Sequence, residues 1–320
     1  MICVSRTTFA AAGAAILLLA LWQMPAGAAS VRDASGRTVA VDDASRIVSI
    51  GGAVTEILYA LGRSDHLVAV DTTSLFPPDA LKSKPNVGYF RQLSPEGVIG
   101  LAPSVILAVE GSGPKEAVAV LQSASIPLVS IPDKFEGDGI VEKIKMIAKA
   151  VDAEREGECL SRLVTNDLTA LASLRAEIKT PVRVLFILSF MNGRPMVAGR
   201  GTAADGLIRM AGAVNAFDNF DGYKILNDEA VLAAAPDAVI AMSRPGLDLD
   251  ASSVFSHAAF RETPAAKQKR FFAMDGLYML GFGPRTARAA RDLSQSLYPD
   301  IKFAELPSEA RNNIGKPCRN

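Results

Sequence analysis

The sequence predicts an α/β protein of two similar lobes with parallel sheets, joined by one long α-helix, with a ligand cleft between the lobes. Three observations support this fold class. Short apolar segments alternate with helical segments in both halves of the chain, as in proteins whose helices cover a parallel sheet. One segment of the first half recurs in the second half. Between them, residues 139–179 contain no proline and keep helical spacing.

The first half alternates regularly between strand and helix. Gly51 and Gly52 make a turn after the first apolar segment, Gly62 ends the first helix, and Pro103 breaks the chain before a buried segment. We expect strands at 46–50, 67–70, 105–109 and 126–131, and helices at 55–61, 93–101 and 117–123.

Residues 139–179 form the predicted connection between the halves. Their apolar residues recur at helical spacing until Pro181, which predicts one or two long amphipathic helices, the second near 153–178. The second half then restarts, with strands expected at 182–188, 238–241 and 271–274 and helices at 202–211, 228–235 and 286–298. We divide the chain into a signal peptide (1–28), an N-terminal lobe (29–150), a linking helix (151–180) and a C-terminal lobe (181–320).

The recurring segment supports a duplication. Residues 93–108 align without gaps to residues 226–241 at a constant offset of 133, and four positions are identical. These are the leucines at 93 and 226, the glutamates at 96 and 229, the prolines at 103 and 236, and the alanines at 108 and 241. Two such lobes leave a cleft between them, where ligands usually bind.

The N-terminal residues predict that the protein is exported. Arg6 precedes an apolar run over 9–22, and small residues follow Pro25, which is the pattern of a cleaved signal peptide. The chain has 34 basic and 34 acidic residues, so losing Arg6 leaves one net negative charge and gives no indication of nucleic-acid binding. Cys159 and Cys318 remain; export permits a disulfide between them, but their spacing does not establish one.

A tyrosine and an arginine follow the turn that ends at Gly88. On an extended segment Tyr89 and Arg91 would point the same way. A tyrosine oxygen is an anionic ligand for ferric iron and a known axial ligand of haem. A neighbouring guanidinium favours the phenolate, or grips a carboxylate of the ligand.

At this point the chain resembles the periplasmic solute-binding proteins of ABC importers for haem, cobalamin and ferric siderophores, whose two Rossmann-like lobes are bridged by one long helix. The opening strand and helix (49–62) and the two glutamate-containing repeats carry the general resemblance. Segments 87–94, 197–213 and 280–286 resemble the haem branch. That resemblance implies that Tyr89 ligates haem iron.

The haem propionates would need cations. Arg91 and Arg244 are our candidates because arginine binds carboxylates bidentately, and Arg200 is a third. Apolar cover for the porphyrin would come from Phe90, Met191, Met242 and Tyr278. The histidines of the mature chain, His66 and His257, match no motif of the family, which argues against a second, histidine ligand.

Glu96 and Glu229 are the predicted docking residues. In the family one such glutamate per lobe meets an arginine on each subunit of the permease dimer. Acids at equivalent positions of two lobes suit a two-fold partner and orient its approach. The resemblance therefore implies a monomeric periplasmic carrier, not an enzyme, with haem and an ABC permease dimer as partners. Asp205 and Asp228 fit helix starts, and we assign them no chemistry.

Other functions remain to be weighed. A ferric-siderophore or cobalamin carrier of the same family is the main alternative, although siderophores would favour several cations in the cleft. An exported hydrolase would need a nucleophile elbow, and the sequence has no Gly-x-Ser-x-Gly segment. A zinc or manganese carrier would need several histidines. The GxGxxG pattern of dinucleotide sites is also absent.

Overall fold

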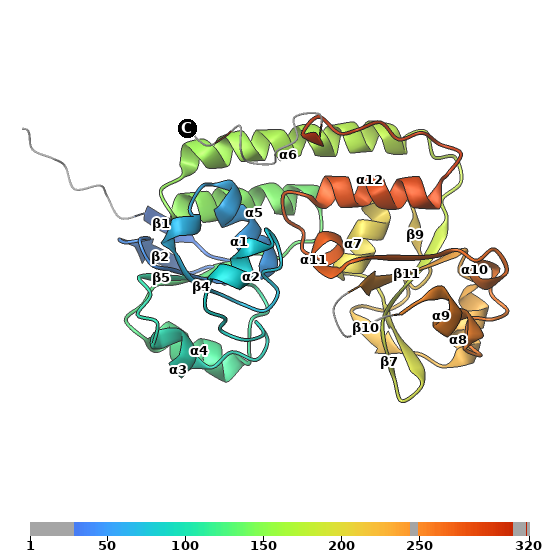
Figure 1. The fold of residues 1–320 in the computed structure, drawn as a ribbon, viewed down its shortest axis with the longest axis horizontal. Coiled ribbons are helices and arrows are strands. Elements are labelled where there is room, and N and C mark those ends of the chain that lie inside the picture. The colour runs from blue at the N-terminus through green and yellow to red at the C-terminus, as the bar shows by residue number, and fades with distance from the viewer. Residues whose placement is uncertain (1–28, 244–248, 310–317, 319–320) are drawn as a thin grey trace, which may run out of the picture.

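The computed structural model describes residues 29–243, 249–309 and 318. Two lobes lie side by side, and one long helix, α6, runs across both of them (Figure 1). The predicted signal peptide and Arg244 fall outside the described residues. Among the described helices, none is both long and apolar enough to cross a membrane.

The N-terminal lobe is built on a four-stranded parallel sheet, as predicted. Its strand order is β4-β3-β5-β6, with bounds Leu67–Val70, Ile47–Ile50, Val105–Val109 and Leu128–Ile131. Every residue of β3 and β5 is buried, because helices cover both faces of a parallel sheet. The helices are α1 (Gly52–Ala60), α2 (Asp79–Ser83), α3 (Pro95–Ile99) and α4 (Lys115–Ser123), with a short 3-10 turn, η1, at Ser64–His66. A hairpin of β1 (Ala29–Arg32) and β2 (Thr38–Val41) precedes them.

Two helices fill the predicted connection. They are α5 (Gly137–Ala150) and α6 (Glu154–Arg175), and the chain turns between them where Asp152 has a left-handed φ of 49°. The helices pack closely because Gly157 has no side chain; a Cβ there would lie 2.3 Å from the Cβ of Ala148. The second helix was expected near 153–178, and it begins at Glu154 and ends at Arg175.

The C-terminal sheet is mixed, which corrects the expectation of a parallel sheet in each lobe. Its order is β10-β8-β7-β11-β12, and β9 also pairs with β7. Strands β7 (Arg183–Met191), β9 (Val214–Asn215), β11 (Ala238–Ser243) and β12 (Phe271–Asp275) run parallel. Strand β8 (Arg194–Ala198) returns antiparallel, and β10 (Tyr223–Ile225) pairs antiparallel with β8. The physical reason is the Asn192-Gly193 turn, whose two residues both have positive φ, as hairpin turns of this type require.

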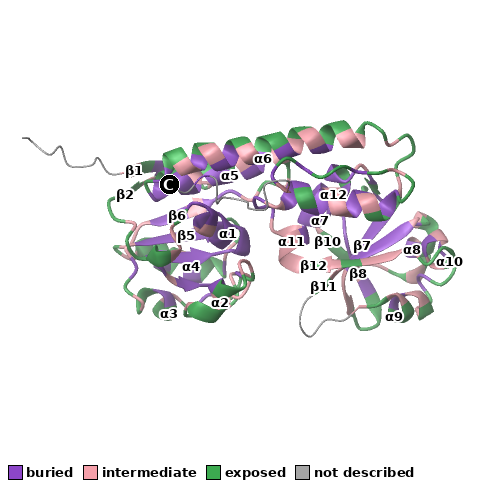
Figure 2. Cartoon of the chain, turned by 45° about the horizontal axis from the view of Figure 1, so that its top comes forward, coloured by how far each residue is buried: buried purple, intermediate pink, exposed green. Residues whose placement is uncertain are grey.

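Helices cover the C-terminal sheet on both faces. They are α7 (Ala203–Met210), α8 (Asp228–Ala234), α9 (Ala251–Ser256), α10 (Pro264–Lys267), α11 (Gly276–Leu280) and α12 (Thr286–Leu297). One hydrophobic core runs through both lobes under α5, α6, α7 and α12. The other face of each sheet has its own smaller core, and the buried residues follow the strands (Figure 2).

The predicted duplication is confirmed in atomic detail. Helices α3 and α8 start at equivalent caps, Ser94 and Asn227, whose side chains accept the N–H three residues on. Both segments then reach an alanine with positive φ, at 46° in one lobe and 44° in the other. In both lobes an arginine guanidinium donates to the carbonyl two residues before the buried proline, over 2.7 Å from Arg46 and 3.2 Å from Arg183.

The two cysteines form a disulfide. Cys159 on α6 is bonded to Cys318, so the pairing that the sequence left open exists in the structure. It holds the C-terminal residue 318 against the long helix.

Candidate functional site

Tyr89 lies on a loop that is held by the ends of β4 and β5, the two strands on either side of β3. After β4, the N–H of Val70 donates to the carbonyl of Pro85, and the N–H of Val87 donates back to the carbonyl of Val70. On the other side, Gly113 donates to the carbonyl of Phe90 and accepts from the N–H of Leu93. The loop therefore sits at the carboxyl ends of β4 and β5, where open α/β sheets place their ligands.

The local conformation differs from the extended segment that we expected. The N–H of Gln92 donates to the carbonyl of Tyr89 over 2.7 Å, so residues 89–92 form a turn, and alternation cannot set the direction of Tyr89 and Arg91. The phenol ring of Tyr89 packs edge-on against Phe90, at 4.8 Å between centroids, and the Arg91 guanidinium lies 5.0 Å from the Phe90 ring centre. Tyr89 keeps 39% of its surface exposed, which leaves a phenol available for a ligand.

Tyr223 approaches the same space from the other lobe. It opens β10, opposite Ala198, and its ring contacts Phe186 at 6.4 Å between centroids. Burial raises the pKa of the Tyr223 phenol, a hydrogen bond with Thr202 and the charge of Arg91 lower it, and Tyr89 raises it further. The last two effects require that residues of the N-terminal lobe lie near this phenol.

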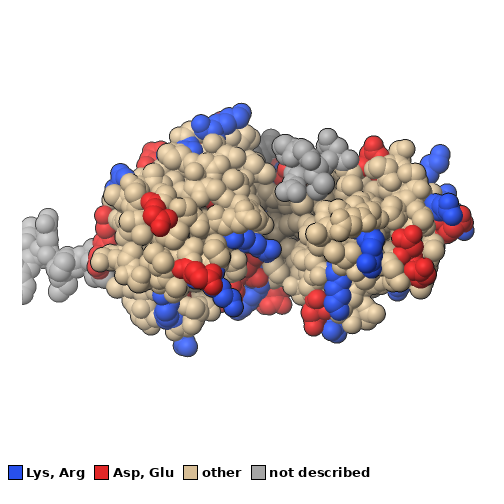
Figure 3. Space-filling model, turned by 90° about the horizontal axis from the view of Figure 1, so that it is seen from below, with Lys and Arg blue, Asp and Glu red and all other residues tan. Residues whose placement is uncertain are grey.

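Tyr223 is partly enclosed by protein. The side chain is 36% exposed, yet burial is the main cause of its raised pKa. The phenol is therefore surrounded by protein on some sides, although the side chain is not buried. Seen from below, the molecule is hollowed between the lobes (Figure 3). Sequence reasoning missed Tyr223; the Asn192-Gly193 hairpin signal, which creates β8 and so a partner for β10, was the clue.

The predicted cations are placed unequally. Arg91 is exposed beside the Tyr89 turn. Arg200 lies just after β8, and its guanidinium donates to Asp221 over 3.1 Å, so Asp221 competes with any ligand carboxylate. Arg244 lies outside the described residues. Of the predicted site residues, the structure thus brings Tyr89 and Arg91 together.

The expected apolar residues also separate. Phe90 packs against the core beside Tyr89. The Tyr278 hydroxyl donates to Asp292 over 2.7 Å, and burial is the main cause that raises its pKa. Met191 ends β7 at the hairpin, and Met242 lies partly buried near Gly276.

Both histidines make ordinary backbone contacts. His66 Nδ1 hydrogen-bonds with the carbonyl of Ala44, and His257 Nε2 with that of Gly193. Among the described residues, no three His, Cys, Asp or Glu side chains gather as a metal site.

The first helix does not offer a free anion site. The N–H of Gly51 donates to Asp71, and the N–H of Gly52 donates to Thr73, both over 2.9 Å. The start of α1, where dinucleotide-binding folds hold a phosphate, is therefore already satisfied by side chains of the same lobe.

A buried ion pair joins the two lobes. Arg285, at the start of α12, donates from two nitrogens to the two oxygens of Glu56 on α1, each over 3.0 Å. The guanidinium also stacks 3.6 Å from the centre of the Phe76 ring. Nearby, the fully buried Lys143 donates to Asp133 and to the carbonyl of Phe282. Two segments that carried the family resemblance, 49–62 and 280–286, thus meet in space.

The predicted docking glutamates occupy equivalent exposed positions. Glu96 is the second residue of α3 and Glu229 the second residue of α8. Within the described part of the chain, neither carboxylate forms a salt bridge; Glu96 accepts a hydrogen bond from the Ser94 hydroxyl.

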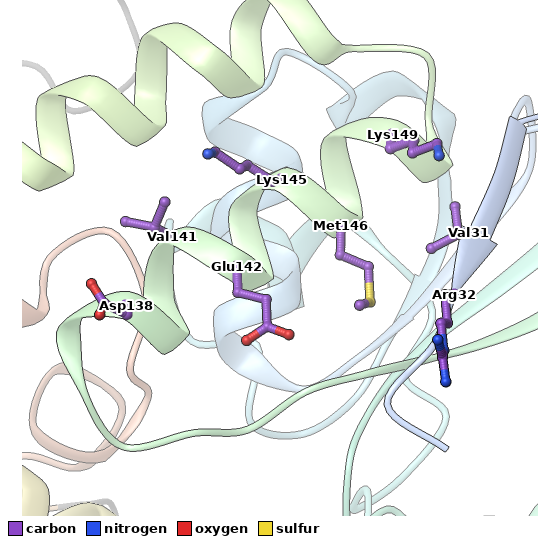
Figure 4. Close-up of a pocket in the computed structure, with 8 residues that line it drawn as sticks. All are labelled: Val31, Arg32, Asp138, Val141, Glu142, Lys145, Met146 and Lys149. Carbon is purple, nitrogen blue, oxygen red and sulfur yellow. The ribbon is translucent and has the colours of Figure 1, made fainter. Parts of the chain in front are cut away.

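The N-terminal lobe also has a depression of ≈ 550 Å³ between β1 and α5. Figure 4 shows its lining, which mixes Arg32 and Lys145 with Asp138 and Glu142. It shares no lining residue with the space around Tyr89 and Tyr223, and we assign it no function.

With this geometry in place, comparison defines the class of protein. Residues 47–277, more than half of the chain, match the family described as periplasmic binding protein. The chain belongs to this family of solute-binding transport proteins, and it is a substrate-binding protein of an ABC transporter. The family implies a permease partner and a periplasmic or extracellular location.

Similar proteins and structures carry names with two different ligands. The structure is similar to the periplasmic heme-binding protein RhuT from Roseiflexus sp. RS-1 in its apo form, with 35% identity, a TM-score of 0.76 and coverage of 81% of this chain and 100% of that chain. An uncharacterized ABC transporter substrate-binding lipoprotein of Bacillus subtilis, YvrC, is 28% identical over 85% of this chain and 86% of its own. The vitamin B12-binding protein of Pectobacterium carotovorum is 26% identical over 62% of this chain and 72% of its own.

Proposed function

We propose that this protein binds ferric haem between its lobes through the Tyr89 phenolate and delivers it to an inner-membrane ABC importer. The observation that carries the proposal is Tyr89 itself, an exposed phenol on a fixed turn, with Arg91 two residues on and Tyr223 opposite. An N-terminal signal peptide would take the chain to the periplasm. The similarity to a periplasmic heme-binding protein supports the same ligand.

The chemistry follows from the phenol. A free tyrosine has a pKa of about 10, so ferric iron must displace the phenolic proton when it binds. Arg91 stabilises the negative charge that then forms on the oxygen. A phenolate prefers ferric to ferrous iron, which suits transport through an oxidising compartment.

The rest of the haem would be held by both lobes. Arg91 and Arg244 would bind the propionates, and Arg200 would do so if it left Asp221. Phe90 would cover one part of the porphyrin, and Tyr223 would meet the ligand from the C-terminal lobe. The raised pKa of the Tyr223 phenol makes loss of its proton more costly than for a free tyrosine, so we assign it a hydrogen-bonding role and not iron ligation.

Delivery would use the two exposed glutamates. Glu96 and Glu229 carry charges that no described residue neutralises, at the same place in each lobe. We propose that each meets a cation on one subunit of the permease dimer. Such contacts orient the encounter more than they add affinity.

A cobalamin or ferric-siderophore carrier is the second candidate, and the vitamin B12-binding relatives favour cobalamin. Equilibrium titration of residues 29–320 separately with hemin, cyanocobalamin and a ferric siderophore separates these functions. With hemin we expect a change in Soret absorbance that saturates at one fixed molar ratio of hemin to protein. We expect no tight binding of cyanocobalamin or of the ferric siderophore. Tight cyanocobalamin binding without a specific Soret change would overturn the haem assignment.

A further inference from the structure

A large apolar residue lies one helical turn after each docking glutamate. Ile99 follows Glu96 by three positions on α3, and Leu232 follows Glu229 by three positions on α8. Residues three apart lie on the same face of a helix. Ile99 is 36% exposed and Leu232 is 38% exposed, so each lobe presents an acid and an apolar side chain together.

The underlying helices fix these pairs in the same way. Val98 and Val231 immediately precede the two apolar residues. Both are completely buried, each in the smaller hydrophobic core of its lobe. Because these valines face the core, the next residue along each helix faces solvent. The carbonyls of Ile99 and Leu232 then accept the N–H of Ala102 and Ala235, the two alanines with positive φ.

Single exposed apolar residues are common and need no explanation. Here neighbouring positions differ between the lobes: the cap Ser94 corresponds to Asn227, and Gly97 corresponds to Ala230. Neither the glutamate nor the large apolar residue is needed to cap or bury its helix, yet both recur. A surface that appears twice suits a partner that offers its complement twice.

The two surfaces also lie where such a partner would reach the ligand. Helices α3 and α8 belong to different lobes, and both lie on the side of the molecule away from α6 (Figure 1). The hollow between the lobes is visible from that same side (Figure 3). A single two-fold symmetric protein that contacts both helices would therefore cover the opening of the hollow.

We propose that Ile99 and Leu232 are matched apolar anchors that enter two equivalent pockets of the permease dimer, each next to a cation that pairs with Glu96 or Glu229. The inference rests on the proposed delivery function. The glutamates supply orientation. The apolar side chains supply affinity, because removing their exposed apolar surface from water is favourable.

The test measures binding of the chain, with and without hemin, to the ABC importer of its own organism in lipid nanodiscs. Ile99→Ser and Leu232→Ser should each raise the Kd about tenfold, because each removes one apolar side chain that is buried on binding. The double variant should raise it about a hundredfold, because distant sites contribute additively. Ile99→Leu and Leu232→Ile should bind like the wild type. The matched control is Val214→Ser, at a residue that is 39% exposed on β9 but outside the repeat, and its Kd should not change.

The same variants titrated with hemin separate this inference from the haem assignment. All of them should bind hemin like the wild type. A double serine variant that binds the importer within twofold of the wild type would overturn the inference, as would an effect confined to one lobe. A wild type that does not bind the importer would overturn both this inference and the delivery function. A wild type that binds the importer but not hemin would overturn only the ligand.

Discussion

At the scale of single residues, Tyr89 and Tyr223 illustrate how far a sequence can be interpreted. Tyr89 was predicted because phenol and guanidinium lie two positions apart and the segment resembles a known haem-ligating loop. Tyr223 was not, because nothing near it in the chain suggests chemistry. Its position depends on a three-residue strand that pairs with β8, and on the placement of one lobe against the other.

We predict that Tyr223→Phe weakens hemin binding about three- to tenfold, the typical value of one hydrogen bond, while the ferric spectrum keeps its form. The phenol would donate to the ligand without binding iron. Absorption titration measures both quantities. A variant with a changed charge-transfer band would show instead that Tyr223 is a ligand of the iron.

The same phenol should make stability depend on pH. Its pKa is raised in the folded protein, chiefly by burial, while unfolded tyrosines titrate near pH 10. The folded state thus holds this proton more tightly, and the associated stability is fully present below pH 10 and is lost as pH rises through the raised pKa. Urea unfolding between pH 8 and 11 should show a smaller loss for Tyr223→Phe than for the wild type; equal losses would contradict the assignment.

At the scale of elements, periodicity and duplication predicted the parallel sheet, the long helices and the second-lobe counterparts of the first-lobe elements. The constant offset of 133 predicted the second-lobe elements correctly because both segments have the same physical requirements. Each begins at a polar capping side chain and continues with a buried valine and a buried proline. The hairpin of β7 and β8 was missed, although Asn192-Gly193 between apolar segments is a strong local signal.

Other elements were beyond local reasoning. The turn at 89–92 forms because Phe90 and Leu93 bond to Gly113 on another loop, a contact that the local pattern does not encode. The break between α5 and α6 depends on Asp152 in a left-handed conformation. The disulfide could not be predicted locally either, since the two cysteines are 159 residues apart and only the fold brings them together.

At the scale of the whole molecule, the two lobes are joined by a common hydrophobic core and not only by surface contacts. One apolar core continues through both, and the close approach of α7 to the N-terminal lobe requires Gly206, where a Cβ would lie 2.5 Å from the carbonyl oxygen of Phe135. Glu56 and Arg285 add a buried ion pair across this seam. Burial raises the pKa of the Glu56 carboxyl, and the Arg285 guanidinium opposes that rise.

We predict that Glu56→Ala lowers the free energy of unfolding by about 3–5 kcal/mol, because it leaves the Arg285 guanidinium buried without its partner. Urea denaturation measures the change. The control is Glu142→Ala, which breaks an ion pair with Lys134 of similar length that is about half exposed, and which should change stability little. Equal effects of the two substitutions would show that the seam does not depend on this pair.

The most direct test of the central claim is the absorption spectrum of the ferric hemin complex of the wild type beside that of Tyr89→Phe. Tyr89 is exposed on a turn held by backbone bonds, so removing its hydroxyl should leave the fold intact. We predict a saturable complex with a tyrosinate-to-iron charge-transfer band in the wild type, and loss of that band and of tight binding in the variant. An unchanged spectrum and affinity in Tyr89→Phe would contradict the account.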